Sequence, residues 1–217
     1  MVPSNGCYVV TASSTNGLRE FRARAALLAT PAYAAAKLVR PFAATAAEAL
    51  AEISYPPIAV TFSVYRRSAI AHPLDGFGML IPECERRQIL GTIFSSTLFE
   101  NRAPDGLVLL TSFVGGTRQP ELAQRDEQAI ADLVQSELAA VLGASANPEF
   151  VRVKQWPRAI PQYTLGHAER IGQVAAAERN FPGLFFCANY RGGISIGDCI
   201  KSADRAADQI AAFLRGA

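Results

Sequence analysis

Runs of apolar residues of strand length dominate the middle of the chain. Strands are predicted over Ile58–Arg67 ("IAVTFSVYRR"), within Arg87–Phe99, over Gly106–Gly116 ("GLVLLTSFVGG") and over Glu149–Trp156. A shorter strand is expected at the end of "HPLDGFGMLIPE". No helical pattern separates the strands that precede Gly116, so they predict an antiparallel sheet.

One helical pattern lies inside this middle part. Apolar residues recur at helical spacing over Pro120–Leu142, and Gly143 is a plausible stop. After the next strand, Pro157 and Pro161 exclude a continuous ladder. The middle of the chain is therefore expected to be a sheet with one covering helix.

The two ends of the chain carry a different pattern, in which strands alternate with helices. Strands are predicted at Cys7–Ala12 and Leu18–Thr30, and helices at Tyr33–Val39, Ala44–Ile53 and Ala168–Arg179. The stretch "LFFCANYRGGISIGDCI" then reads as a buried strand, a glycine turn and the start of the helix Ile196–Leu214. We expect both ends to contribute to one parallel α/β layer.

The predicted fold class is therefore mixed, α/β with an α+β middle. Residues 1–55 and 162–217 form the α/β part, and residues 56–161 form the antiparallel sheet and its helix.

Composition excludes several classes of protein. Half of the residues are hydrophobic and 18% are charged, which argues against a disordered chain. The formal net charge is +2, so the charge gives no reason to expect nucleic-acid binding.

No apolar stretch is long enough to span a bilayer, and the first residues do not resemble a signal peptide, so a cytoplasmic location is predicted. The four cysteines lie far apart and are expected to be reduced, mostly buried thiols, with no metal site.

The glycine turn is the first candidate for chemistry. Gly192, Gly193 and Gly197 permit close backbone approach at the start of a helix, which suits an anionic or electron-rich group. The alternative is a plain tight turn with Ser195 or Asp198 as the helix N-cap. The pattern is not GxGxxG, so we expect contact with the edge of a cofactor that other segments hold.

The sequence argues against a hydrolase. The chain has no GxSxG motif, and Cys199 with His167 makes a weak pair because Cys199 belongs to the apolar face of a predicted helix. Chemistry supplied by a cofactor is the better hypothesis.

Several apolar residues have two interpretations. Trp156 is either a core or interface aromatic, or a lid beside a planar ring. Phe77, Leu80, Ile93 and Phe113 are ordinarily core residues, but they would line an apolar pocket if one face of the sheet is open.

Five ordered segments together resemble one family. They are "HPLDGFGMLIP", "LGTIFSSTLFENRAPDG", "LLTSFVGG", "AIPQYTLGH" and "ANYRGGISIGDCI". They resemble the oxygen-dependent protoporphyrinogen oxidases of the flavin-containing amine oxidase superfamily, and the likeness runs from "ALLATPAYAAA" onward.

The resemblance implies a cofactor, a substrate and site residues, but no catalytic residue. FAD would meet the backbone of Ile194, Ser195 and Ile196, and Trp156 would lie near the flavin. The three apolar positions that would sandwich the tetrapyrrole are Leu80, Ile93 and Phe113. The family oxidises protoporphyrinogen IX to protoporphyrin IX in haem synthesis, passing hydrides to FAD and then to oxygen.

The departure from the family concerns the start of the fold. Family members begin with a strand–GxGxxG–helix unit for the FAD pyrophosphate, which this sequence lacks. The resemblance therefore implies the C-terminal part of a Rossmann-like FAD-binding domain plus a substrate-binding sheet, inactive without the N-terminal half. The expected partners are the N-terminal half, a porphyrinogen substrate and a second copy of the chain in a homodimer. A peripheral membrane contact is also expected, through the absent half.

The sequence is compatible with other substrates and with a non-catalytic role. The substrate of such a flavoprotein could be coproporphyrinogen, an amine or a carotenoid, although "IPQYTLGH" favours the porphyrin branch. The chain could also be a non-catalytic remnant that binds porphyrin or a partner through its sheet.

Overall fold

The chain folds as two compact units in a computed structural model that describes residues 1–15 and 17–216. The split unit consists of Met1–Ser54 and Ile160–Ala217, and the sheet unit consists of Tyr55–Ala159. The chain therefore leaves the split unit once, builds the sheet unit and returns.

The sheet unit is built on five strands in the order β6-β7-β8-β5-β9. They are β5 (Ile58–Arg66), β6 (Gly78–Leu80), β7 (Gly91–Phe94), β8 (Leu107–Gly115) and β9 (Phe150–Trp156). Every neighbouring pair is antiparallel, as predicted. The strand expected within Arg87–Phe99 is shorter than that range, because Ser95–Leu98 forms the short helix α3. Two single 3-10 turns, η1 (Arg67–Ala69) and η2 (Glu83–Glu85), complete the connections.

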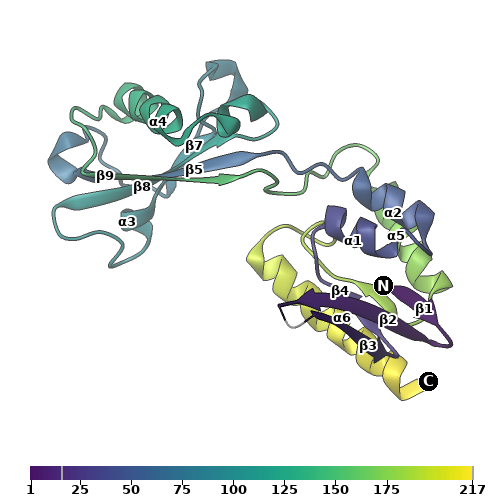
Figure 1. The fold of residues 1–217 in the computed structure, drawn as a ribbon. Coiled ribbons are helices and arrows are strands. Elements are labelled where there is room, and N and C mark those ends of the chain that lie inside the picture. The colour runs from purple at the N-terminus through teal and green to yellow at the C-terminus, as the bar shows by residue number, and fades with distance from the viewer. Residues whose placement is uncertain (16, 217) are drawn as a thin grey trace. The chain divides into compact units, whose positions relative to one another are not determined.

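One face of this sheet is covered by helix α4 (Glu127–Leu142), as Figure 1 shows. Alternate residues of β5 and β8 are buried, and they form one cluster with Ile130, Val134 and Leu138 of α4. The helix predicted to begin at Pro120 is wrong in its first part, where Pro120–Gln124 is the 3-10 turn η3. Asp126 then caps α4 by accepting a hydrogen bond from the Ala129 N–H (2.9 Å).

The remaining residues of the same strands form the opposite face of the sheet. Because side chains alternate along a strand, residues paired across strands share a face. One row of pairs joins Leu80, Gly91, Phe113, Val60 and Lys154 from β6 to β9. The next row, parallel to the first, joins Gly78, Ile93, Thr111, Phe62 and Arg152. We call the surface made by these two rows, with Ile58 and Trp156 beside them, the open face.

The split unit holds a parallel pair of strands among helices (Figure 1). The strands are β4 (Ala26–Leu28) and β10 (Leu184–Phe186), and the helices are α1 (Ala32–Val39), α2 (Ala44–Ala51), α5 (His167–Asn180) and α6 (Ile196–Gly216). Buried alanines of α1 and α2 allow these helices to pack closely. No helix in the described ranges is long and apolar enough to cross a membrane.

The prediction that the first strands join this parallel pair is correct only for the end of Leu18–Thr30, which forms β4. It is wrong for Cys7–Ala12 and for the first part of Leu18–Thr30. β1 (Val2–Ser4), β2 (Cys7–Ser14) and β3 (Gly17–Ala23) form an antiparallel sheet of their own. Asn5 and Gly6 make the β1–β2 turn with positive φ angles of 46° and 74°, which is typical of a two-residue hairpin. Buried Tyr8 fixes this sheet to the unit by donating a hydrogen bond to the Phe181 carbonyl (2.8 Å).

Candidate functional site

The glycine turn between β10 and α6 has a backbone that only glycine adopts easily. Gly192 has a φ of 84° and Gly193 a φ of 123°. A Cβ on Gly193 would lie 2.5 Å from the side chain of Asp198. The turn can therefore pack closely against the start of α6 only because residue 193 has no side chain.

Two aromatic residues from "AIPQYTLGH" hold this turn in place. The Tyr163 hydroxyl donates to the Asn189 carbonyl (3.0 Å) and accepts from the Gly193 N–H (3.1 Å). The His167 ring stacks on Tyr163 with centroids 4.0 Å apart, and its Nε2 lies 2.9 Å from the Tyr190 carbonyl. Tyr163 was missed at the sequence level, and His167 anchors the turn from the first residue of α5.

An ion pair fixes the other side of the same turn. Arg191 donates to Glu178 Oε1 of α5 (2.7 Å), and this hydrogen bond raises the pKa of Arg191 above its ordinary value. The same carboxylate oxygen accepts from the Phe186 N–H of β10 (2.9 Å). The end of β10, the turn and α5 are thus joined by one carboxylate.

The start of α6 is capped by Ser195, one of the two residues predicted for that role. Ser195 Oγ accepts from the Asp198 N–H (3.1 Å) and donates to Asp198 Oδ2 (2.7 Å). That hydrogen bond is the main cause of a lowered pKa for Asp198. The N–H groups of Ile196 and Gly197 have no acceptor in the described part of the chain, and the side chains of Ile194 and Ile196 are 40% and 82% exposed.

The sheet unit brings together the other predicted residues. Leu80 and Phe113 occupy the same row of the open face, and Ile93 lies in the adjacent row. Trp156 lies beside these rows, opposite Ile58, and is half exposed. Leu80 is 90% exposed, so the interpretation of these four residues as ordinary core does not hold for Leu80 and Trp156. Phe77, just before β6, is also largely exposed. Ile194, Ser195 and Ile196 belong to the split unit.

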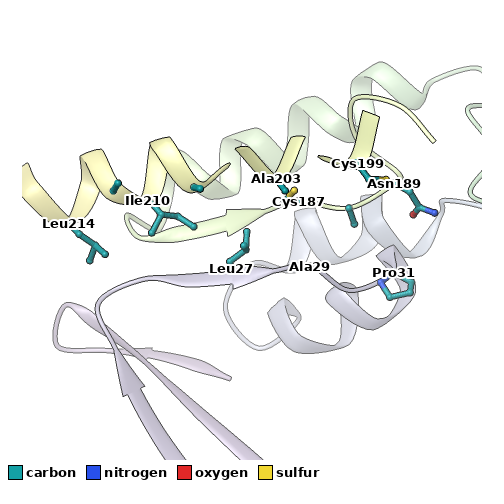
Figure 2. A pocket seen from close by; sticks show the side chains of 12 residues that line it. Leu27, Ala29, Pro31, Cys187, Asn189, Cys199, Ala203, Ile210 and Leu214 are labelled. Atoms are coloured by element: carbon teal, nitrogen blue, oxygen red, sulfur yellow. The ribbon is translucent and has the colours of Figure 1, made fainter. Parts of the chain in front are cut away.

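An apolar groove of about 740 Å³ lies in the split unit along α6 (Figure 2). Leu27 of β4 points toward α6, and Ile210 and Leu214 of α6 point toward β4. The groove is also lined by Cys187 and Cys199, which are half-buried. The expectation of mostly buried thiols is therefore wrong, since Cys7 is also half-buried and Cys84 is exposed.

Replacing Gly193 by alanine should loosen the start of α6, because the new Cβ meets Asp198 and the φ is unfavourable for L-residues. We expect a loss of about 1–3 kcal/mol in unfolding free energy, measured by urea denaturation with circular dichroism. Gly172→Ala is the control, since Gly172 is exposed within α5 with open space around its Cβ position. That change should stabilise the protein by about 0.5–1 kcal/mol. Equal effects of both substitutions would contradict the packing described here.

Three curated relatives that match the chain are named as porphyrinogen oxidases. The chain is 34% identical to the chloroplastic protoporphyrinogen oxidase of Nicotiana tabacum over 96% of its own length and 40% of the relative's. It is 35% identical to the chloroplastic protoporphyrinogen oxidase 1 of Spinacia oleracea, over 97% of this chain and 39% of the relative. The coproporphyrinogen III oxidase of Propionibacterium freudenreichii matches at 30% identity, covering 88% and 36%. The chain thus spans about two fifths of the length of these relatives.

Solved structures agree on the fold. A crystal structure from Exiguobacterium sp. 255-15 superposes with a TM-score of 0.79 at 21% identity, covering 96% of this chain and 45% of that one. The cyclohexylamine oxidase of Brevibacterium oxydans superposes with a TM-score of 0.68 at 18% identity, covering 95% of this chain and 46% of that one. The family model described as "Flavin containing amine oxidoreductase" matches residues 3–211. The chain belongs to the flavin-containing amine oxidoreductase family, whose members use a flavin cofactor.

Proposed function

We propose that this chain is the substrate-binding and flavin-edge portion of an enzyme that oxidises protoporphyrinogen IX to protoporphyrin IX, with FAD as cofactor and oxygen as acceptor, in haem biosynthesis. The activity belongs to the whole protein, because the chain spans about two fifths of its curated relatives. The observation that carries the proposal is the convergence of Leu80, Ile93 and Phe113, from three separate motifs, on one open face of the sheet. The names of the relatives that match nearly the whole chain support the same substrate class.

Coproporphyrinogen is the second candidate substrate. A relative named for that activity matches over 88% of the chain, at lower identity than the plant protoporphyrinogen oxidases. The two substrates share the tetrapyrrole ring and differ in the number of carboxylate side chains. The open face supports both, and direct comparison of the two substrates would decide between them.

The residues of the glycine turn fit the edge of a flavin ring. Two N–H groups without acceptors, on Ile196 and Gly197, lie at the positive end of α6 and suit electron-rich ring atoms. The exposed side chains of Ile194 and Ile196 offer apolar contact at the same end of the helix. When bound, a flavin supplies the redox chemistry, accepting hydride and being reoxidised by oxygen. The turn itself would orient the ring through a backbone that Tyr163 holds by two hydrogen bonds.

The open face would hold the substrate by contact with the flat sides of its ring. Leu80, Ile93 and Phe113 would exclude water from those faces, and the half-exposed Trp156 would border the ring beside them. Gly91 lies between Leu80 and Phe113 in the same row, so no side chain divides this wall.

The apolar groove along α6 is proposed to receive the N-terminal FAD-binding part of the whole protein. β4 and β10 pair only with each other within the described residues, although parallel sheets are normally covered and extended on both sides. The groove beside them is lined almost entirely by apolar side chains. A segment that supplies further strands and an apolar helix face would bury both features.

The cellular location stays a prediction. The sequence suggested a cytoplasmic protein with peripheral contact to the inner face of the cell membrane. The plant relatives are named as chloroplastic or mitochondrial, and their names apply to those proteins alone.

Covering of the groove should be visible by cysteine labelling. In the isolated chain, a maleimide should modify Cys187 and Cys199, since both line the open groove. In the chain joined to the N-terminal part of the tobacco relative, labelling of both should fall sharply, as read by peptide mass spectrometry. Exposed Cys84 in the sheet unit is the internal control and should react equally in both proteins. Unchanged labelling of Cys187 and Cys199 would contradict the proposed docking.

The isolated chain should not retain FAD. Its sequence has no GxGxxG unit for the pyrophosphate, so only contacts with the ring edge would remain. Purified protein should be colourless, and titration followed by flavin fluorescence should show weak or no binding. A yellow preparation with stoichiometric flavin would overturn this expectation.

Replacing Phe113 by alanine tests the proposed function in a complete enzyme that carries this chain. Losing the buried ring contact costs about 1–3 kcal/mol, so the KM for protoporphyrinogen should rise about tenfold or more. Flavin content should stay constant, because Phe113 belongs to the open face and not to the glycine turn. Phe21→Ala, at an exposed site of β3, is the matched control and should leave KM unchanged. Loss of flavin with an unaltered KM would show that the two sites are wrongly assigned.

A further inference from the structure

We propose that Lys154, assisted by Arg152, binds a carboxylate on the rim of the tetrapyrrole. This inference rests on the proposed function and assigns the charged part of the same site. Both side chains are exposed and lie on the open face at the edge strand β9. The resemblance that suggested Leu80, Ile93 and Phe113 pointed to neither of them.

The strand register places Lys154 in line with the apolar wall. Lys154 pairs with Val60, and Val60 pairs with Phe113, so all three share one row. Two strand spacings separate Phe113 from Lys154, roughly 10 Å between their backbones. Arg152 pairs with Phe62 in the adjacent row, which also holds Ile93. A ring resting on Phe113 and Ile93 would therefore present its rim to the two cations.

The charges on this face are of one sign. The two rows that define it contain Lys154 and Arg152 and no carboxylate in the described strands. At the far end of β5, Arg66 is already paired with Glu149 (2.7 Å) and offers no free charge. An apolar surface with unneutralised cations at one edge is complementary to an apolar ring with anionic side chains.

Lys154 is the stronger candidate of the two. Its Nζ lies 5.2 Å from the centre of the Trp156 ring, which holds the ammonium group beside the predicted flavin-side aromatic. Arg152 also borders a polar groove of about 520 Å³ with Glu127 and Asp132 of α4, although no ion pair joins them among the described residues. The carboxylates of α4 therefore compete for Arg152 and not for Lys154.

An ordinary role for Lys154 must be separated from this one. Lysine on an edge strand commonly prevents the strand from pairing with other chains. That role requires a charge but no ligand, so it predicts no change in affinity for any small molecule. Binding of a carboxylate predicts a change that depends on the ligand's charge.

The test uses two stable probes with the same ring, protoporphyrin IX and its dimethyl ester, in which methyl groups remove the two carboxylate charges. Each is titrated into the chain and into its variants, and binding is followed by porphyrin fluorescence. Lys154→Ala should weaken binding of the acid by about threefold to fivefold, and the double change with Arg152→Ala by about tenfold. Binding of the ester should not change, and Lys154→Arg should retain most of the affinity for the acid. Lys37→Ala removes the same charge from an exposed site on α1 of the split unit and should have no effect.

The outcomes separate this inference from the proposed function. If the chain binds acid and ester equally, or Lys154→Ala weakens both alike, the carboxylate contact is wrong and the porphyrin site on the open face stands. If Lys154→Ala leaves both affinities unchanged, the edge-strand role is the correct one. If neither probe binds the unaltered chain, the proposed substrate class fails, and the inference fails with it.

Discussion

The pairing register of the five strands β6-β7-β8-β5-β9 is the constraint on which the rest of the sheet unit depends. Because side chains alternate along each strand, fixing one pair of residues fixes the face of every other residue. Burial of Ala59, Leu110 and Val114 beneath α4 sets that register energetically. A shift by one residue would bury Lys154 and Arg152 and would expose the core. The packing on the opposite side thus determines which residues belong to the open face.

The glycine turn depends on a different kind of constraint, a network of polar contacts. Tyr163, His167 and Glu178 each hold backbone groups of the segment from Phe186 to Gly193. All three residues precede the turn in the sequence. They therefore hold the turn against α5 and against the segment that precedes α5. Loops that orient a ligand through their backbone need such support, because side-chain packing alone leaves a glycine-rich turn free to move.

Sequence patterns were sufficient where local and tertiary preferences agree. The apolar runs predicted β5 and β8, and the lack of a helical pattern between them predicted their antiparallel arrangement. Gly143 predicted the end of α4. The apolar pattern could not predict whether β2 is parallel or antiparallel, because that depends on the strands with which it pairs. β2 was expected in a parallel layer but pairs antiparallel with β1 and β3. The turn signal Asn5–Gly6 was present in the sequence and would have indicated a hairpin. No local pattern shows that Tyr163 bonds the glycine turn or that Lys154 shares a row with Phe113. Both depend on contacts between residues distant in sequence.

The chain enters and leaves the sheet unit at neighbouring points. The Gln162 N–H donates to the Ser54 carbonyl (2.9 Å), and the Ala159 N–H donates to the Pro56 carbonyl (3.2 Å), so the outgoing and returning segments run side by side. An insertion whose two ends meet in this way can be exchanged for another without altering the fold that carries it. Residues 55–159 therefore have the form of an inserted, exchangeable domain. A lineage, or a protein engineer, could replace the open face while leaving the glycine turn intact.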